Sequence, residues 1–108
     1  ELRMIKTMRL PQNKINKACY KLGELKDTSA IKPLLTKILD PRISNSLEFK
    51  GLTVNYCRLV ALKKISGMDS GRKFDQGRPD TLATLFYLDW AIENGYLSTR
   101  NDVDIYYY

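Results

Sequence analysis

The sequence predicts an all-α domain, and three observations lead to this conclusion. Apolar residues recur at spacings of three and four through nearly every apolar segment, which is the period of an amphipathic helix. Pro and Gly fall where such helices would begin or end. The segment ACYKLGELKD also aligns with RLVALKKISG at an offset of 40 residues, apart from a mismatch of Ala18 with Arg58. Paired helices at this period are typical of stacked helical repeats.

Two helices are predicted before residue 27. Leu2, Ile5 and Met8 lie three residues apart and predict a short amphipathic helix that Pro11 ends. A longer helix is predicted from about residue 12 to residue 26. Its apolar face comprises Ile15, Ala18, Cys19, Leu22 and Leu25.

The next helix follows a polar turn that begins with Asp27, which supplies N-cap chemistry. Pro33 falls in the first turn of this helix, where the missing N–H costs least, and Asp40-Pro41 ends the helix. Its apolar face comprises Ile31, Leu34, Leu35, Ile38 and Leu39. The two helices together therefore form a hairpin.

Two further helices are predicted beyond a polar loop at residues 42–48. One runs from about Leu52 to Ile65, with Gly67 as its C-cap. The other has Pro79 in its first turn and ends before Gly95. Its buried stripe is predicted to comprise Leu82, Leu85, Phe86, Asp89 or Trp90, and Ile92.

Residues 68–77 and the C-terminal tail lack the helical period. The stretch MDSGRKFDQG contains two glycines and little apolar content, so we expect an extended loop there. In the tail, Val103, Ile105 and Tyr107 alternate with polar residues. This alternation predicts either a short extended segment or a tail docked on the helices.

The hairpin resembles the repeat of the bacterial HEAT-like family. That repeat has a first helix ending in A-x-x-x-L-G-x-L-x-D and a second helix that opens with a small residue, Ile and a Leu pair. The matching residues are Ala18, Leu22, Gly23, Leu25 and Asp27, then Ala30, Ile31, Leu34, Leu35 and Asp40. VNYCRLVALKKISGMD looks like the family's closing repeat, and GRKFDQGRPDTLATLFYLDWAIENG is similar to its Trp-bearing ending.

This resemblance implies a single domain over residues 1–108, with about five helices in a right-handed stack. The repeat units would cover about 12–40 and 52–95, followed by a tail at 96–108. One hairpin cannot bury its apolar face alone, whereas stacked hairpins can, and they leave an outer surface free for a partner. Gly23 is then a close-packing site between helices.

Charge favours an acidic partner. Lys and Arg number 18 against 12 Asp and Glu, a net charge of +6, which suits nucleic acid, an acidic protein face or an anionic membrane. A plainly solvated basic surface is the alternative. No apolar run approaches the ~20 residues of a membrane span, and we expect no signal peptide. Cys19 and Cys57 are expected to be free buried thiols in a reducing, cytoplasmic compartment.

Catalytic motifs are absent, so we expect a protein that is not an enzyme. The chain contains no His, which removes the commonest general base and zinc ligand, and we expect no metal site and no cofactor. Asp89 and Glu93 share a helix face but have no base or metal partner in the pattern. Asp102 and Asp104 are expected to be solvated.

Two surfaces are candidates for binding a partner. The loop at residues 68–77 is long for a compact helical domain, and its Arg72, Lys73 and Phe74, together with Tyr106 of the aromatic tail, are predicted to contact a protein. Phe74 has no evident place in the core. The alternative is a basic face of the second helix, formed by Lys14, Lys17 and Lys21 at helical spacing.

The leading functional hypothesis is a non-enzymatic protein-binding module, most concretely a bacterial immunity or antitoxin-like protein that blocks a toxin domain. Its positive charge requires the toxin to have an acidic contact face. The alternative is a nucleic-acid-binding protein that uses its basic helix faces. A resemblance to phycobilin-lyase-type HEAT proteins would imply chromophore attachment, but the chain lacks His. The oligomeric state stays open.

Overall fold

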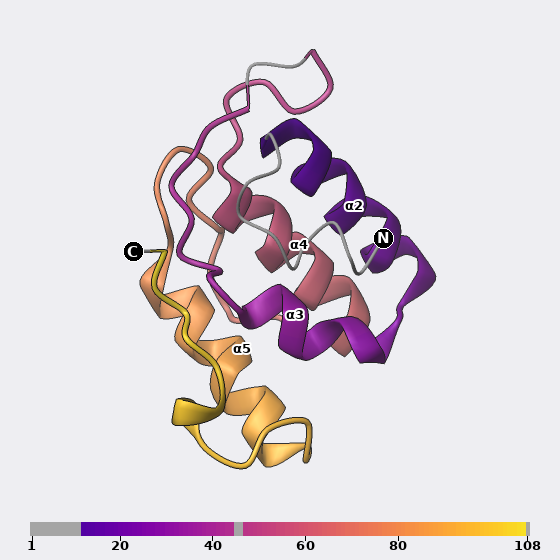
Figure 1. Cartoon of the computed structure of the whole chain (residues 1–108), viewed down its shortest axis with the longest axis vertical. Coiled ribbons are helices and arrows are strands. Elements are labelled where there is room, and N and C mark those ends of the chain that lie inside the picture. Colours follow the sequence, from indigo (N-terminus) through magenta and orange to yellow (C-terminus); the bar gives the residue numbers. More distant parts are fainter. Residues whose placement is uncertain (1–11, 45–46, 108) are drawn as a thin grey trace.

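The computed structural model describes residues 12–44 and 47–107. Within these ranges the structure is helical, without strands, apart from a single antiparallel bridge between Ile43 and Thr53. This confirms the all-α prediction, while the helix expected at residues 2–10 lies outside the described residues. The elements are α2 (Gln12–Leu25), η1 (Thr28–Ala30), α3 (Ile31–Leu35), α4 (Val54–Ser66), α5 (Thr81–Glu93) and η2 (Arg100–Asp102) (Figure 1).

Helices α2 and α4 lie side by side and run in the same direction (Figure 1). Gly23 permits their close approach, because a Cβ atom at this position would lie 3.1 Å from the Cα atom of Ala61. At the same end of the pair, Lys64 donates a hydrogen bond to Glu24, 40 residues earlier. Gly23 is therefore a close-packing site, as predicted.

The buried face of α2 follows the predicted spacing except at its last position. Ile15, Ala18, Cys19 and Leu22 are buried, but Leu25 is 71% exposed. Leu25 is the last residue of α2, directly before Lys26 (φ 51°), where the chain turns away from the helix axis. The prediction that Leu25 belongs to the core was wrong.

The second helix of the hairpin is much shorter than the sequence predicted. It ends at Leu35, and Lys37 has a left-handed backbone (φ 59°). The N–H of Lys37 donates to the carbonyl oxygen of Asp104 at 2.7 Å, and that of Leu39 donates to Ile105 at 2.9 Å. The chain leaves the helix because these amides bond to the tail instead of to the preceding turn.

The C-terminal tail is docked on the domain, and its backbone at Val103 is extended, so features of both alternatives occur in this segment. Ile105 is buried, and Lys37 forms an ion pair of 2.6 Å with Asp104. The hydrogen bond from Lys37 lowers the pKa of the Asp104 carboxyl. Two residues beyond Ile105, the ring of Tyr107 lies 5.4 Å from the guanidinium of Arg42, a cation–π contact.

Helix α4 begins two residues later than predicted and ends at the predicted C-cap. Thr53 is its N-cap, and Gly67 (φ 69°) ends it.

Helix α5 differs from the prediction in two respects. Its N-cap is Asp80, so Pro79 lies before the helix rather than in its first turn.

The buried face of α5 also differs from the predicted stripe, since Leu82 is 65% exposed. Helix α5 is apolar nearly all round, so its period alone cannot select the buried side. In the structure the buried side includes small residues, which allow close contact with the neighbouring elements. These buried residues are Ala83, Thr84, Tyr87, Leu88 and Ala91.

A buried arginine explains the mismatch in the internal repeat. Arg58, which aligns with Ala18, is 1% exposed, and its Nη1 donates to the carbonyl oxygens of Pro33 (2.9 Å) and Leu34 (3.1 Å). These carbonyls lie at the C-terminal end of α3, where they have no partner within the helix. Burial lowers the pKa of Arg58. The side chain thus fastens α3 to α4.

Asn55 joins three parts of the fold. It is fully buried, its Nδ2 donates to the carbonyl of Ile38 (2.8 Å) and to Oγ1 of Thr84 (3.2 Å), and its Oδ1 accepts from the N–H of Asp80 (2.9 Å). The side-chain amide of Asn55 in α4 therefore forms hydrogen bonds to the segment after α3 and to the start of α5.

Candidate functional site: a basic groove

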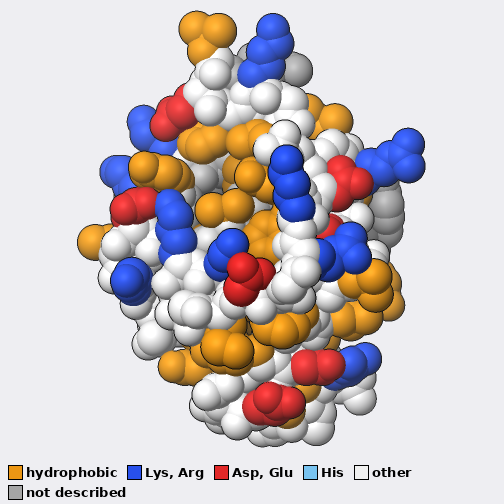
Figure 2. Space-filling view, turned by 180° about the vertical axis from the view of Figure 1, so that it is seen from behind, with side chains coloured by type: hydrophobic (Ala, Val, Ile, Leu, Met, Phe, Trp, Pro, Cys, Tyr) orange, Lys and Arg blue, Asp and Glu red, His pale blue; other side chains and the backbone are white. Residues whose placement is uncertain are grey.

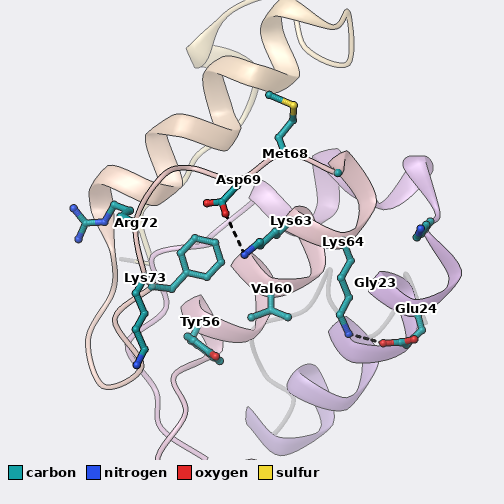
Figure 3. Close-up of a pocket in the computed structure, with 13 residues that line it drawn as sticks. Gly23, Glu24, Tyr56, Val60, Lys63, Lys64, Met68, Asp69, Arg72 and Lys73 are labelled. Carbon is teal, nitrogen blue, oxygen red and sulfur yellow. Dashed lines mark hydrogen bonds and ion pairs between the residues drawn. The ribbon is translucent and has the colours of Figure 1, made fainter.

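An open groove of about 690 Å³ lies between the end of α2, one side of α4 and the loop that follows α4 (Figure 3). We call it the basic groove. Its residues come from two stretches of the chain, 23–26 and 56–74, brought together by the packing of α2 on α4. The lining comprises Gly23, Glu24, Lys26, Tyr56, Val60, Lys63, Lys64, Gly67, Met68, Asp69, Arg72, Lys73 and Phe74.

The lining of the basic groove carries more cationic than anionic side chains. Its cations come from all three elements: Lys26, Lys63, Lys64, Arg72 and Lys73. Glu24 and Asp69 are the lining carboxylates, which leaves a net charge of +3. Figure 3 shows that the two carboxylates are engaged, Glu24 with Lys64 and Asp69 with Lys63 at 3.8 Å. Arg72 pairs in turn with Asp80, which lies outside the lining, so the cationic excess available to a ligand is carried by Lys26 and Lys73.

The apolar part of the groove includes Tyr56, Val60 and Phe74. The ring of Phe74 meets the ring of Tyr56 edge-on at 6.4 Å, and it meets Tyr87 at 6.1 Å. Lys63 Nζ lies 5.9 Å from the centre of the Phe74 ring. Phe74 is half-buried against the core, so the expectation that it has no place there was wrong. It anchors the loop and presents only part of its ring.

The loop after α4 is held in place by a buried carboxylate. Asp80 accepts a hydrogen bond from the N–H of Asp75 (3.2 Å) and caps α5 through the N–H of Ala83 (3.1 Å). Arg72 turns away from the lysines of α4 (Figure 3) and forms an ion pair of 3.2 Å with Asp80. Arg72 thus stabilises the conformation of the loop through this ion pair, and it also lines the basic groove.

The structure brings together three of the four residues predicted to bind a partner. Arg72, Lys73 and Phe74 all line the basic groove, whereas Tyr106 lies in the tail, is 64% exposed and lines a different hollow beside α5. The alternative set, Lys14, Lys17 and Lys21, lies on the exposed side of α2 and outside the groove lining.

Sequence reasoning missed the lysines that α2 and α4 contribute to the groove. Lys63 and Lys64 lie in the last turn of α4, where the helix dipole favours cations in general, so the sequence pattern did not single them out as candidate site residues. Lys26 lies directly after α2. Only the packing of the two helices shows that these residues face the loop.

Basic and hydrophobic side chains gather across the middle of one face of the molecule. Figure 2 shows hydrophobic side chains across the middle of this face, with Lys and Arg side chains around and between them and fewer acidic groups. A surface of this composition suits a ligand that has both negative charge and apolar area.

The carboxylates and thiols considered for chemistry have structural roles. Asp89 bonds to Arg100 at 2.7 Å, and Asp102 caps η2, where the N–H of Ser98 lowers the pKa of its carboxyl. Burial raises the pKa of the free Cys19 thiol to about 11 and that of the free Cys57 thiol to about 12, so both stay protonated at neutral pH. No metal-ligating group of three or more side chains occurs within residues 12–44 and 47–107.

Tyr87 connects the groove loop to α5, and its titration gives a prediction. Its hydroxyl donates to the carbonyl oxygen of Met68 at 2.8 Å. Burial, aided by the Asp69 carboxylate, raises the pKa of Tyr87 from 10.0 to about 12. Because the pKa of Tyr87 is higher in the folded than in the unfolded chain, the protonated hydroxyl stabilises the folded state. This contribution to the free energy of unfolding is complete below pH 10.0 and is lost as the pH rises to about 12.

We expect Tyr87→Phe to lower the free energy of unfolding by about 1 kcal/mol at neutral pH, through loss of that hydrogen bond. The variant should also lose less stability than the wild type as the pH rises above 10.0. Urea unfolding across this pH range measures both effects. Tyr106→Phe, at an exposed site, is the matched control and should stay within about 0.5 kcal/mol. Equal alkaline losses in wild type and Tyr87→Phe would contradict the assignment.

Comparisons with known proteins return no match to this chain, whether among family models, curated proteins or solved structures. Among the described residues, each helix is too short or too polar to cross a membrane.

Proposed function

We propose that this chain is a non-enzymatic protein-binding module, and that the basic groove receives an acidic partner segment carrying an apolar side chain. The observation behind this proposal is the groove itself, in which Lys26 and Lys73 carry the cationic excess left by the internal ion pairs and border an apolar surface that includes Tyr56, Val60 and Phe74. Lys26 and Lys73 are exposed at its rim. Carboxylates of the partner would pair with these lysines while an apolar side chain covers the ring surface.

The most concrete version of the proposal is a bacterial immunity or antitoxin-like protein of HEAT-like type, acting in the cytoplasm against a toxin with an acidic contact face. The parallel packing of α2 on α4, with Glu24 bonded to Lys64 at the offset of the internal repeat, supports the repeat reading. The short α3 departs from an even helical hairpin. For this reason the arrangement of five helices in a right-handed stack is stated only as part of the proposal.

The test is selection of peptides from a random displayed library against the full chain. We expect the selected peptides to be enriched in Asp and Glu around an aromatic or aliphatic residue. Their affinity should fall at least about tenfold for the double variant Lys26→Glu with Lys73→Glu. These lysines are exposed, and reversing them breaks none of the ion pairs that hold the groove.

The matched control is the double variant Lys14→Glu with Lys17→Glu, which changes the net charge by the same amount on the exposed side of α2. It should leave peptide affinity within about threefold, since only long-range charge is altered. Peptides without acidic enrichment, or peptides that bind the groove variant as well as wild type, would overturn the proposal. Loss of affinity in the control variant alone would move the contact surface to α2.

Nucleic-acid binding is the second candidate, and the exposed row of Lys14, Lys17 and Lys21 favours it. Binding of a DNA duplex or a single-stranded RNA should then weaken steeply as salt rises, because bound counterions are released. The Lys14→Glu, Lys17→Glu variant should abolish that binding. Absence of binding at low salt would remove this candidate.

A further inference from the structure

The outer side of helix α5 carries an apolar stripe that the fold leaves at the surface. Leu82 is 65% exposed, and Phe86 and Trp90 are half-buried. These three residues are spaced four apart, so they form one ridge along the helix. The opposite side of α5, which includes Tyr87 and Ala91, is buried in the core.

Tyr96 widens this stripe beyond the end of the helix. Its ring is stacked on that of Trp90, with the ring centroids 5.4 Å apart, and the residue is 41% exposed. Figure 1 shows α5 at the edge of the molecule, away from α2. A contiguous apolar surface of this kind on a small domain indicates an interaction site.

The two ends of the stripe carry opposite charges. Arg78, which is exposed, lies four residues before Leu82 and just before the N-terminus of α5. Glu93, the last residue of α5, is exposed at the other end. Between them Asp89 is paired with Arg100 at 2.7 Å, so its charge is balanced within the chain. A stripe that is positive, then apolar, then negative is complementary to itself when it is turned end for end.

We propose that α5 is the interface of a homodimer, in which a second copy of this chain covers the stripe in antiparallel orientation. A two-fold axis near Phe86 brings this residue of both copies together. Leu82 lies four residues before Phe86 and Trp90 four residues after it, so Leu82 of each copy faces Trp90 of the other. Arg78 of each copy then lies at the end where the other carries Glu93.

The order of charges along the stripe favours a second copy over an unrelated partner, because α5 supplies both halves of the match. Antiparallel pairing also places the two helix dipoles in opposite directions. One helix from each chain buries less than the ~1,200 Å² of a stable standard interface, so the dimer is weak. The groove loop contacts α5 through Tyr87, on the buried side, so the dimer interface and the basic groove are separate. Each can fail its test without the other.

Sedimentation of the full chain at concentrations from about 10 µM to about 1 mM measures this assembly. We expect the average mass to rise with concentration toward twice the mass of the chain. Leu82→Glu should raise the dissociation constant at least about tenfold, because it places a carboxylate in the apolar middle of the interface. Leu25→Glu makes the same change at a leucine of α2 that is 71% exposed. This matched control should dimerise within about threefold of wild type, since only long-range charge is altered.

A charge exchange tests the antiparallel orientation. Arg78→Glu places like charges at both ends of the pair and should weaken dimerisation at least about fivefold at low salt. Adding Glu93→Arg restores opposite charges and should return the dissociation constant to within about threefold of wild type. Both changes agree with the helix dipole of α5, so the fold should be kept. In a parallel pair Arg78→Glu would only replace one like-charge contact with another and would leave the affinity unchanged.

Four results would each overturn the proposal: a monomer at every concentration up to about 1 mM, unchanged dimerisation in Leu82→Glu, loss of the dimer in Leu25→Glu, or no recovery in the charge-exchanged variant. Assemblies that grow beyond two copies would also contradict it, because a two-fold contact closes at the dimer. Circular dichroism of each variant shows that a loss of dimer is not a loss of fold.

Discussion

Replacing Asn55 with alanine is expected to lower the free energy of unfolding by about 3–5 kcal/mol. The substitution leaves the N–H of Asp80 and the carbonyl oxygen of Ile38 without their present partners, and both lie in the interior. An unsatisfied buried group costs about 1–3 kcal/mol, and the small cavity left by the amide adds to this. For a domain of this size, that loss is a large part of the total stability.

Chemical denaturation at neutral pH measures this loss, with fluorescence and circular dichroism as two probes of the transition. Asn101→Ala, which makes the same change at an exposed position, is the matched control and should stay within about 0.5 kcal/mol. A loss below about 1 kcal/mol for Asn55→Ala would mean that solvent or neighbouring groups replace its bonds.

The same substitution should also affect the basic groove. Asn55 accepts from the N–H of Asp80, whose carboxylate in turn holds Arg72 and the backbone of Asp75. In conditions where Asn55→Ala remains folded, the loop should exchange its amide hydrogens faster than in wild type. The wall of the groove is then less well ordered, and the affinity for selected peptides should fall.

The second large effect is expected from removing a leucine side chain of the core. Leu22 in α2 is 2% exposed and Leu35 in α3 is 0% exposed. Replacing either one with alanine should lower the free energy of unfolding by about 2–5 kcal/mol, through lost burial and the cavity left behind. Equilibrium unfolding in urea measures the change.

Two exposed leucines serve as controls with the same change of side chain. Leu25 follows Leu22 by one turn of α2, and Leu82 lies in the first turn of α5. Leu25→Ala and Leu82→Ala should each stay within about 0.5 kcal/mol of wild type. If Leu22→Ala costs less than about 1 kcal/mol, or if Leu25→Ala costs as much, the assignment of the core face of α2 is wrong.

Much of the fold is local in the chain and was predicted on that basis. Helix α4 ends at Gly67, which was predicted as its C-cap and supplies the left-handed residue. Gly23 lies where α2 approaches α4. Each of these features depends on residue type and spacing within a few turns, and so does the loop that carries Arg72, Lys73 and Phe74.

The end of α3 and the buried side of α5 depend on distant parts of the chain. The apolar spacing continues past Leu35, yet Lys37 bonds to Asp104, 67 residues later, and the helix stops. In α5, apolar residues surround the axis, so only its neighbours decide that Tyr87 is buried and Leu82 is exposed.

The candidate sites likewise depend partly on local sequence and partly on contacts between distant parts of the chain. The sequence by itself determined an all-α chain with a positive charge, no His and a long polar loop that carries Arg72 and Lys73. Only the tertiary structure placed Lys26, Lys63 and Lys64 opposite that loop, and only it left the Asn16 side chain buried without a hydrogen-bond partner among the described residues. The physical reason is that periodicity and capping act over a few residues, whereas a groove or a missing hydrogen bond is a property of surfaces that meet after the helices have packed.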